Sequence, residues 1–194
     1  MKLDRNLNLT QKLETDSGAC YIHSTPISRV EWEEYFYVLS QTYASLFMGG
    51  LGVSTGPTMA ALMLRKVAKD QGVWDGEAGV QAGLMGAIRR LTNVVVATDQ
   101  GWQTIPYEVA VSRRLLDEEA QAEVENALVF FICVSSVLRG PKSRPKLLVT
   151  LGMMRALWDA QTTPLDVTAF ASSLTTSTPV APITPSPRVS SLPS

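Results

Sequence analysis

Leucine alternates with polar residues at the start of the chain. The leucines that fall on one side of an extended segment are Leu3, Leu7, Leu9 and Leu13. A period of two is typical of a half-buried β-strand. Residues 16–18 (Asp-Ser-Gly) are a turn signal, and residues 19–23 form a second short apolar run. The segment 1–26 therefore predicts an N-terminal β-hairpin packed on the body of the protein.

After residue 26 the hydrophobic period becomes helical. Ser28 and Glu31 have the spacing of a capping box, in which each side chain bonds the other residue's backbone N–H. The apolar stripe that follows consists of Trp32, Tyr35, Phe36, Leu39, Tyr43, Leu46 and Phe47. This spacing predicts one helix of about five turns that ends at Gly49.

Further helices are predicted along the middle of the chain. Their ranges are about 57–70, 77–91, 117–138 and 145–160, with a short one after residue 163. The 77–91 helix carries a strip of small residues, Gly79, Ala82, Gly83 and Gly86, which indicates that a neighbour packs closely there. Residues 93–97 fit either an extension of this helix or a short strand. Residues 99–102 are predicted to form a loop, with Pro106 opening a short helix.

The predicted fold class is mainly α. An N-terminal β-hairpin (1–26) precedes a helical domain (27–174), a bundle of about five to six helices. The composition changes at residue 175: nine of the last twenty residues are Ser or Thr and five are Pro. Such a segment buries too little apolar surface to offset its ordering entropy, so residues 175–194 are predicted to be a disordered tail.

Charge and hydropathy exclude two classes of partner. The 194 residues contain 17 Lys and Arg against 18 Asp and Glu, a formal net charge of −1, whereas nucleic-acid binders carry a basic excess. The most apolar run, residues 127–138, is too short to cross a bilayer. We therefore expect no nucleic-acid partner, no membrane, and a cytoplasmic location.

Chemistry-bearing residues are sparse. His23 is the single histidine, and Cys20 and Cys133 are too far apart for a CxxC metal or redox motif. The glycine-rich segment 50–56 lacks the lysine of a phosphate-binding loop, because Pro57 follows its last glycine. The sequence predicts a protein that is not an enzyme and has no cofactor or metal site.

Aromatic and methionine residues are the candidates for binding a partner. Tryptophan and tyrosine are enriched at binding hot spots, and methionine side chains adapt to different partners. The alternative is that most of them fill the core. Together with two loop glycines, the candidates are Trp32, Tyr35, Tyr43, Met48, Gly49, Gly50, Met59, Met63, Trp74 and Trp102.

The layout of several short strings resembles that of a known family. Residues 23–28 (His-Ser-Thr-Pro-Ile-Ser) lead into an aromatic helix, and residues 49–52 (Gly-Gly-Leu-Gly) precede Gly56-Pro57. A helical body with Trp158, residues 164–174 and a Ser/Thr/Pro tail follow. Over about nine tenths of its length the chain resembles the tail assembly chaperones of long-tailed bacteriophages.

This resemblance implies a late, non-enzymatic protein of the host cytoplasm that is absent from the finished virion. It would bind the tape measure protein and help to recruit the major tail protein. Other implied partners are homo-oligomers and a longer form of the chain made by ribosomal frameshifting. The alternative reading is a structural virion protein of the neck, tail-completion or connector class, which stays in the particle. A small enzyme or regulator is disfavoured by the sparse chemistry.

Overall fold

A computed structural model describes residues 2–3, 7–15, 18–48, 52–99, 101–137, 159–160 and 167–174. The predicted tail, 175–194, lies outside the described residues, as do Gly49, Gly50 and all but the last two residues of the predicted 145–160 helix.

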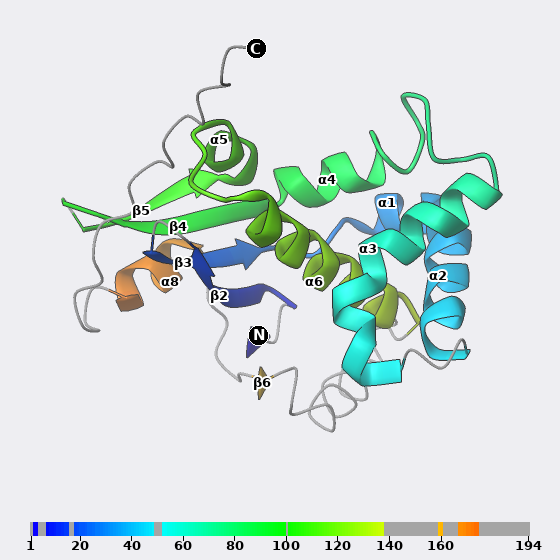
Figure 1. Ribbon diagram of the computed structural model, residues 1–194, viewed down its shortest axis with the longest axis horizontal. Helices are drawn as coiled ribbons and strands as arrows, with labels where there is room; N and C mark the ends of the chain where they lie inside the picture. The colour runs from blue at the N-terminus through cyan, green and yellow to red at the C-terminus, as the bar shows by residue number, and fades with distance from the viewer. Residues whose placement is uncertain are drawn as a thin grey trace, which may run out of the picture.

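The strands of the described residues form one six-stranded sheet in the order β5-β4-β3-β2-β1-β6 (Figure 1). Neighbouring strands are antiparallel, except that β6 runs parallel to β1. The strands are β1 (Lys2–Leu3), β2 (Leu9–Thr15), β3 (Gly18–Ser24), β4 (Thr92–Thr98), β5 (Gly101–Pro106) and β6 (Asp159–Ala160). Residues 159–160, at the end of the range predicted to be a helix (145–160), form strand β6 instead.

The predicted N-terminal hairpin is confirmed in β2 and β3. Leu13 pairs with Cys20 and Leu9 with Ser24, and the side chains of both leucines are buried in the core while Lys12 is exposed. The leucine alternation nevertheless spans more than one strand. Leu7 has a positive φ of 67° and separates β1 from β2, which fold back on each other.

The mainly α prediction is wrong, because two mid-chain strands join the hairpin in a larger sheet. β4 pairs with β3, with Cys20 opposite Val96, and β5 pairs with β4, with Val94 opposite Ile105. The fold is therefore α+β rather than a hairpin attached to a helical bundle. Residues 93–97 belong to a strand, and the predicted loop at 99–102 already contains the start of β5 at Gly101.

Burial on both faces explains why β4 shows no alternation. Residues 94–97 are all buried, since helices cover both sides of this strand. A strand of this kind appears in the sequence as a continuous apolar run, which also fits a buried helix.

The described helices are α1 (Arg29–Glu34), α2 (Phe36–Met48), α3 (Gly52–Asp70), α4 (Leu84–Arg90), α5 (Tyr107–Ser112), α6 (Glu118–Val137) and α8 (Val167–Leu174). The start of the predicted 117–138 helix is confirmed, because Asp117 accepts a hydrogen bond from the backbone N–H of Ala120 at 2.7 Å. Only the second half of the predicted 77–91 helix is helical.

The predicted helix after residue 28 has a break at Tyr35. Its capping box is confirmed, because the Ser28 hydroxyl accepts from Glu31 N–H and the Glu31 carboxylate accepts from Ser28 N–H. Beyond Tyr35 the helix restarts as α2, whose buried residues are Val38, Leu39, Thr42 and Leu46. The side chain of Phe36, predicted to point inward, is 46% exposed.

A Schellman motif ends α3, and the next helix, α4, begins only at Leu84. Val73 N–H bonds the Ala68 carbonyl at 2.9 Å, and Gly72 N–H bonds that of Lys69 at 3.0 Å, with Gly72 at φ 70°. Residues 74–83 then form turns. The predicted close approach to the small-residue strip is confirmed at Gly83, where an added Cβ would collide with the Tyr35 hydroxyl.

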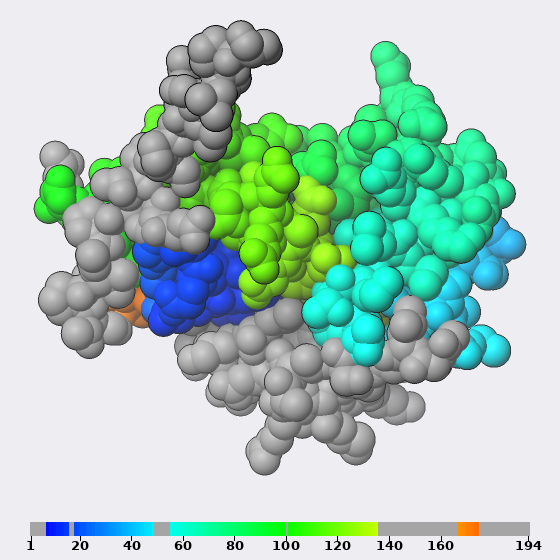
Figure 2. All heavy atoms as spheres, in the orientation of Figure 1, coloured from blue at the N-terminus to red at the C-terminus, as the bar shows by residue number. Residues whose placement is uncertain are grey.

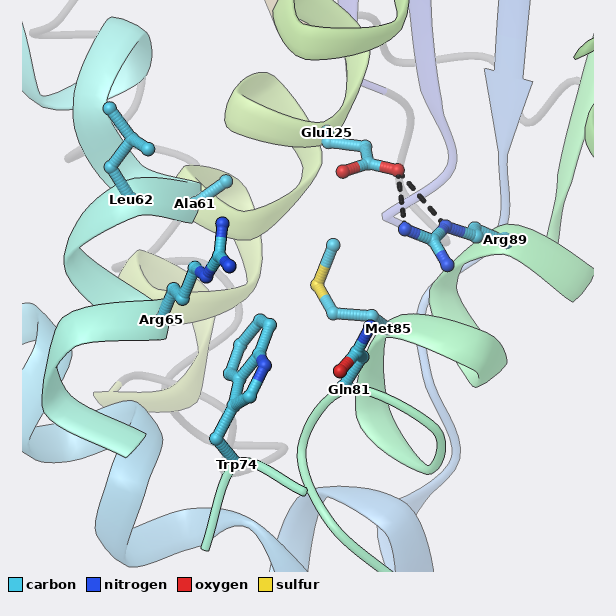
Figure 3. A pocket seen from close by; sticks show the side chains of 8 residues that line it. All are labelled: Ala61, Leu62, Arg65, Trp74, Gln81, Met85, Arg89 and Glu125. Atoms are coloured by element: carbon cyan, nitrogen blue, oxygen red, sulfur yellow. Dashed lines mark hydrogen bonds and ion pairs between the residues drawn. The ribbon is translucent and has the colours of Figure 1, made fainter. Parts of the chain in front are cut away.

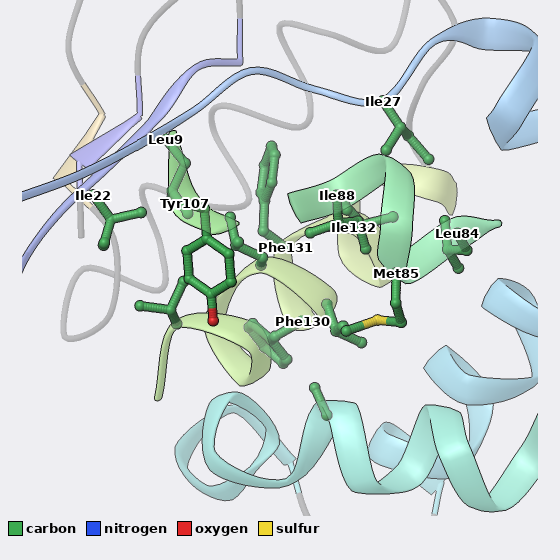
Figure 4. Packing of buried hydrophobic residues seen from close by; sticks show 14 of the residues in the cluster. Leu9, Ile22, Ile27, Leu84, Met85, Ile88, Tyr107, Phe130, Phe131 and Ile132 are labelled. Atoms are coloured by element: carbon green, nitrogen blue, oxygen red, sulfur yellow. The ribbon is translucent and has the colours of Figure 1, made fainter. Parts of the chain in front are cut away.

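The sheet carries a hydrophobic cluster on each face. On the larger side, α6 lies across the sheet with Phe130 and Phe131 packed among Ile22, Tyr107 and Met85 (Figure 4). On the other side, Phe170 and Leu174 of α8 cover Val95. Helix α3 packs against both α2 and α6, so that α1, α2 and α3 lie at the end of the molecule away from the β4–β5 hairpin (Figure 1).

Candidate functional site

The residues predicted to bind a partner do not gather on one surface. Met48, at the end of α2, is 87% exposed, whereas Tyr35 is buried and donates a hydrogen bond to the Ala78 carbonyl at 3.1 Å. Trp102 lies against Tyr21 beside α8. The half-buried members on α1, α2 and α3 are Trp32, Tyr43, Met59 and Met63. Trp74 stands in a loop after α3, and Gly49 and Gly50 lie outside the described residues.

The outward side of α2 carries no charge, and its exposed residues are Phe36, Tyr37, Gln41 and Met48. None of the thirteen residues of this helix is charged, and the uncharged stretch of the sequence continues to Leu64. Tyr37 is 65% exposed, which adds an aromatic side chain to the exposed Phe36 and Met48. The apolar stripe predicts Phe36 to point inward, and nothing in the sequence singles out Tyr37.

A pocket of about 240 Å³ opens between α3, α4, α6 and the loop after α3. Figure 3 shows Arg65 of α3 and Arg89 of α4 approaching it from opposite sides, with Trp74 below and Glu125 of α6 above. Its remaining lining residues are Ala61, Leu62, Gln81 and Met85. In the space-filling view, atoms of α6 separate those of the N-terminal hairpin from those of α3 (Figure 2).

Hydrogen bonds fix the walls of this pocket. Glu125 Oε1 accepts from Arg89 Nε at 3.0 Å and lies 2.8 Å from Arg89 Nη2, and both side chains are partly buried. Asn126 Oδ1 accepts from the backbone N–H of Ala61 at 2.9 Å, which ties α6 to α3. The loop is held by a bond from Gln81 N–H to the Trp74 carbonyl at 3.0 Å. These bonds connect α4 to α6, α6 to α3, and the two ends of the loop.

Arg65 differs from Arg89 in its partners. Its guanidinium carbon lies 5.6 Å from the centroid of the Trp74 ring, a cation–π arrangement. Within the described ranges no carboxylate pairs with it. A stacked guanidinium keeps its N–H groups free at the edge, where they can donate to a carboxylate.

A second pocket, of about 200 Å³, adjoins the other side of the Arg89–Glu125 pair. Tyr107, only 3% exposed, lines it, and its hydroxyl has no hydrogen-bond partner among the described residues. Burial raises the pKa of this hydroxyl, and the Glu125 carboxylate raises it further while Arg89 opposes them. The group therefore stays protonated and is a hydrogen-bond donor.

The arrangement is suited to binding. Two guanidinium groups and one carboxylate leave a net charge of +1 in the larger pocket, beside apolar walls. Among the described residues no three His, Cys, Asp or Glu side chains are grouped to hold a metal ion. Of the residues that line this pocket, sequence reasoning singled out only Trp74 as a partner residue.

In the part of the chain that the structure describes, no helix combines the length and the apolar character needed to cross a membrane. Comparison with protein-family models, with curated proteins and with solved structures finds no match for this chain.

Proposed function

We propose that this protein is a non-enzymatic tail assembly chaperone of a long-tailed bacteriophage. It binds apolar helical segments of the tape measure protein in the host cytoplasm, helps to recruit the major tail protein, and is absent from the mature virion. The proposal joins the resemblance in sequence layout to the surface of the molecule. The observation that carries it is the uncharged outward side of α2.

Helix α2 is unusual for a surface helix because it presents no charge to water. Its exposed residues are Phe36, Tyr37, Gln41 and Met48, whereas surface helices normally carry charged residues on that side. Large apolar side chains exposed on an uncharged helix mark a candidate protein-binding surface. Aromatic and methionine side chains suit a chaperone, because they accommodate many apolar sequences.

An amphipathic helix of the partner is the expected occupant. Such a helix can lay its apolar side along α2 and contribute anchors at positions i, i+3, i+4 and i+7. The exposed Glu33 and Glu34 stand just before α2. Glu33 already pairs with Arg29 at 2.7 Å, so Glu34 is the carboxylate to which a basic residue flanking the apolar stripe of the partner would be complementary.

The test is co-expression with the tape measure protein of the same genome. We expect the native chain to keep the tape measure protein soluble and to co-purify with it. The double variant Tyr37→Glu, Met48→Glu should lose this activity, because it places two charges on the binding surface. Val73→Glu is the matched control, since Val73 is also an exposed apolar residue (43%) and lies beyond α3.

Two outcomes would contradict the proposal. If the native chain leaves the tape measure protein insoluble and unbound, the chaperone function is rejected. If the α2 double variant co-purifies as well as the native chain, α2 is not the binding surface. Circular dichroism and thermal unfolding must first show that all variants keep the native fold.

Two further measurements separate the chaperone from the neck or connector alternative. Mass spectrometry of purified particles should find no copies of the chain, since a connector would be retained. Mass spectrometry of the products of the native locus should find a minor, longer species that shares the N-terminal residues and diverges near the end of the frame. Strand addition to a neighbour's sheet through the β2–β3 hairpin would favour the connector alternative. Both strands lie inside the sheet, however, with β1 beside β2 and β4 beside β3.

A further inference from the structure

We propose that the pocket bounded by Arg65, Trp74, Met85, Arg89 and Glu125 is a binding site for a monocarboxylate with a small aromatic or aliphatic body. This site is separate from α2 and does not depend on the proposed function. The carboxylate belongs either to a free acid or to a glutamate side chain of a bound protein segment. The chemistry that recognises it is the same in both cases.

Charge selects a single negative group. Arg89 is paired with Glu125 at 2.8 Å, whereas Arg65 has no carboxylate partner among the described residues. The pocket thus has one positive charge in excess. A guanidinium fork donates two parallel hydrogen bonds to a carboxylate. A dianion such as a phosphate monoester would bring its second charge close to Glu125 and meet repulsion.

The walls select the body of the ligand. Trp74 and Met85 face the centre of the pocket, with Ala61 and Leu62 on the α3 side (Figure 3). An aromatic or aliphatic group there gains contacts with the indole and the thioether. A volume of about 240 Å³ is below the range of sites for drug-sized ligands, roughly 300–1,000 Å³, so that a small acid or one side chain fills it.

The Arg89–Glu125 pair leaves Arg65 as the group that holds the carboxylate. Glu125 accepts from Arg89 Nε at 3.0 Å, so a ligand carboxylate that entered beside Arg89 would compete with Glu125 for its N–H groups. Arg65 faces the pocket from the opposite side (Figure 3).

The experiment is a titration of the full chain followed by two-dimensional ¹H–¹⁵N NMR. The reporter is the indole N–H signal of Trp74, assigned by its absence in Trp74→Phe. The probes are phenylacetate and its uncharged isostere phenylacetamide. We expect a saturable shift with phenylacetate, and a dissociation constant about ten-fold higher or more for the amide, which is the usual value of one charged hydrogen bond.

Variants on α3 provide the matched comparison. Arg65→Gln should raise the dissociation constant for phenylacetate about ten-fold. Lys66→Gln removes the same charge from the neighbouring exposed position, because Lys66 pairs with Asp70 at 2.6 Å outside the pocket. This control should change the dissociation constant for phenylacetate less than two-fold. Glu125→Gln should tighten binding, because it removes the negative charge from the pocket while Arg89 stays.

A second pair of probes distinguishes the two sources of the carboxylate. The tetrapeptide acetyl-Ala-Glu-Phe-Ala-amide carries only a side-chain carboxylate, and its Gln analogue is uncharged. Saturation by phenylacetate alone assigns the site to free acids, and saturation by the glutamyl peptide assigns it to protein segments. The proposal is overturned if neither carboxylate gives a saturable shift, if the amides bind as tightly, or if Arg65→Gln and Lys66→Gln have equal effects.

Discussion

Replacing Gly56 by alanine should destabilise the native chain, and the same replacement should cost much less in a variant that carries Phe130→Leu. A Cβ added at Gly56 would lie 2.5 Å from Cε2 of Phe130 and 3.0 Å from Cδ2. Carbon atoms in contact are normally about 3.5–4.0 Å apart, so the ring would have to move by about 1 Å. Phe130 is fully buried and stacks on Phe47 at 6.1 Å, which leaves the ring no room.

Two opposing effects set the magnitude. Alanine gains up to about 1 kcal/mol over glycine inside a helix such as α3, but Pro57 follows Gly56, and its ring crowds a Cβ on the preceding helical residue, which reduces this gain. Overpacking a core typically costs about 1–3 kcal/mol. In the native background the clash outweighs the gain, for a net loss of up to about 3 kcal/mol. Phe130→Leu removes Cε2 and Cζ, the ring atoms at 2.5 and 3.4 Å, and with them most of the clash.

The assay is urea unfolding of the native chain, both single variants and the double variant, followed by circular dichroism. The coupling between the two sites should be about 1–3 kcal/mol, well above the ~0.3–0.5 kcal/mol within which independent sites add. Thermal unfolding provides a check, at about 2–4 °C per kcal/mol for a chain of this size. An equal effect of Gly56→Ala in both backgrounds would refute the contact between α3 and α6 at this position.

Two further predictions concern a turn and a buried thiol. Arg114→Gly should stabilise the chain by about 0.5–1 kcal/mol in urea unfolding, because Arg114 has a φ of 57° after α5, whereas Arg113→Gly, at φ −83°, should destabilise it. Burial raises the pKa of the Cys20 thiol from 9.0 to about 12. Between pH 9 and 12 this thiol therefore ionises in the unfolded chain but stays protonated in the folded one. The free energy of unfolding should therefore fall as the pH rises from 9 toward 12, and an undiminished fall in Cys20→Ala would contradict this account.

Strand β2 and helix α6 are predicted correctly by the sequence, each from a different signal. In β2 the buried Leu9 and Leu13 alternate with the exposed Lys12, and the period of two is visible. Helix α6 was recognised because its acidic first turn precedes a long apolar stretch. The sequence of β4 fits a helix as well as a strand, because its two faces meet two different hydrophobic clusters and no polar position alternates. The sequence of β5 gives no strand pattern, because Ile105 is its only buried residue.

The pocket could not be predicted, because no local pattern contains it. Arg65, Trp74, Arg89 and Glu125 come from α3, a loop, α4 and α6, and only the folded chain brings them together. Trp74 was singled out as a loop tryptophan, a residue type common at binding sites. Nothing in the sequence indicates that Arg65 lies over its ring or that Arg89 pairs with a glutamate 36 residues away.

The pairing of β3 with β4 sets the order in which this protein can fold during synthesis. Cys20 and its partner Val96 are separated by 76 positions, which a ribosome adding about 5–20 residues per second needs roughly 4–15 s to translate. During that interval the edge of β3 next to Tyr21 and Ile22 has no strand beside it. The nascent β2–β3 hairpin can therefore pair with other chains until β4 is synthesised. The helices between β3 and β4 depend on local contacts and can form during this interval.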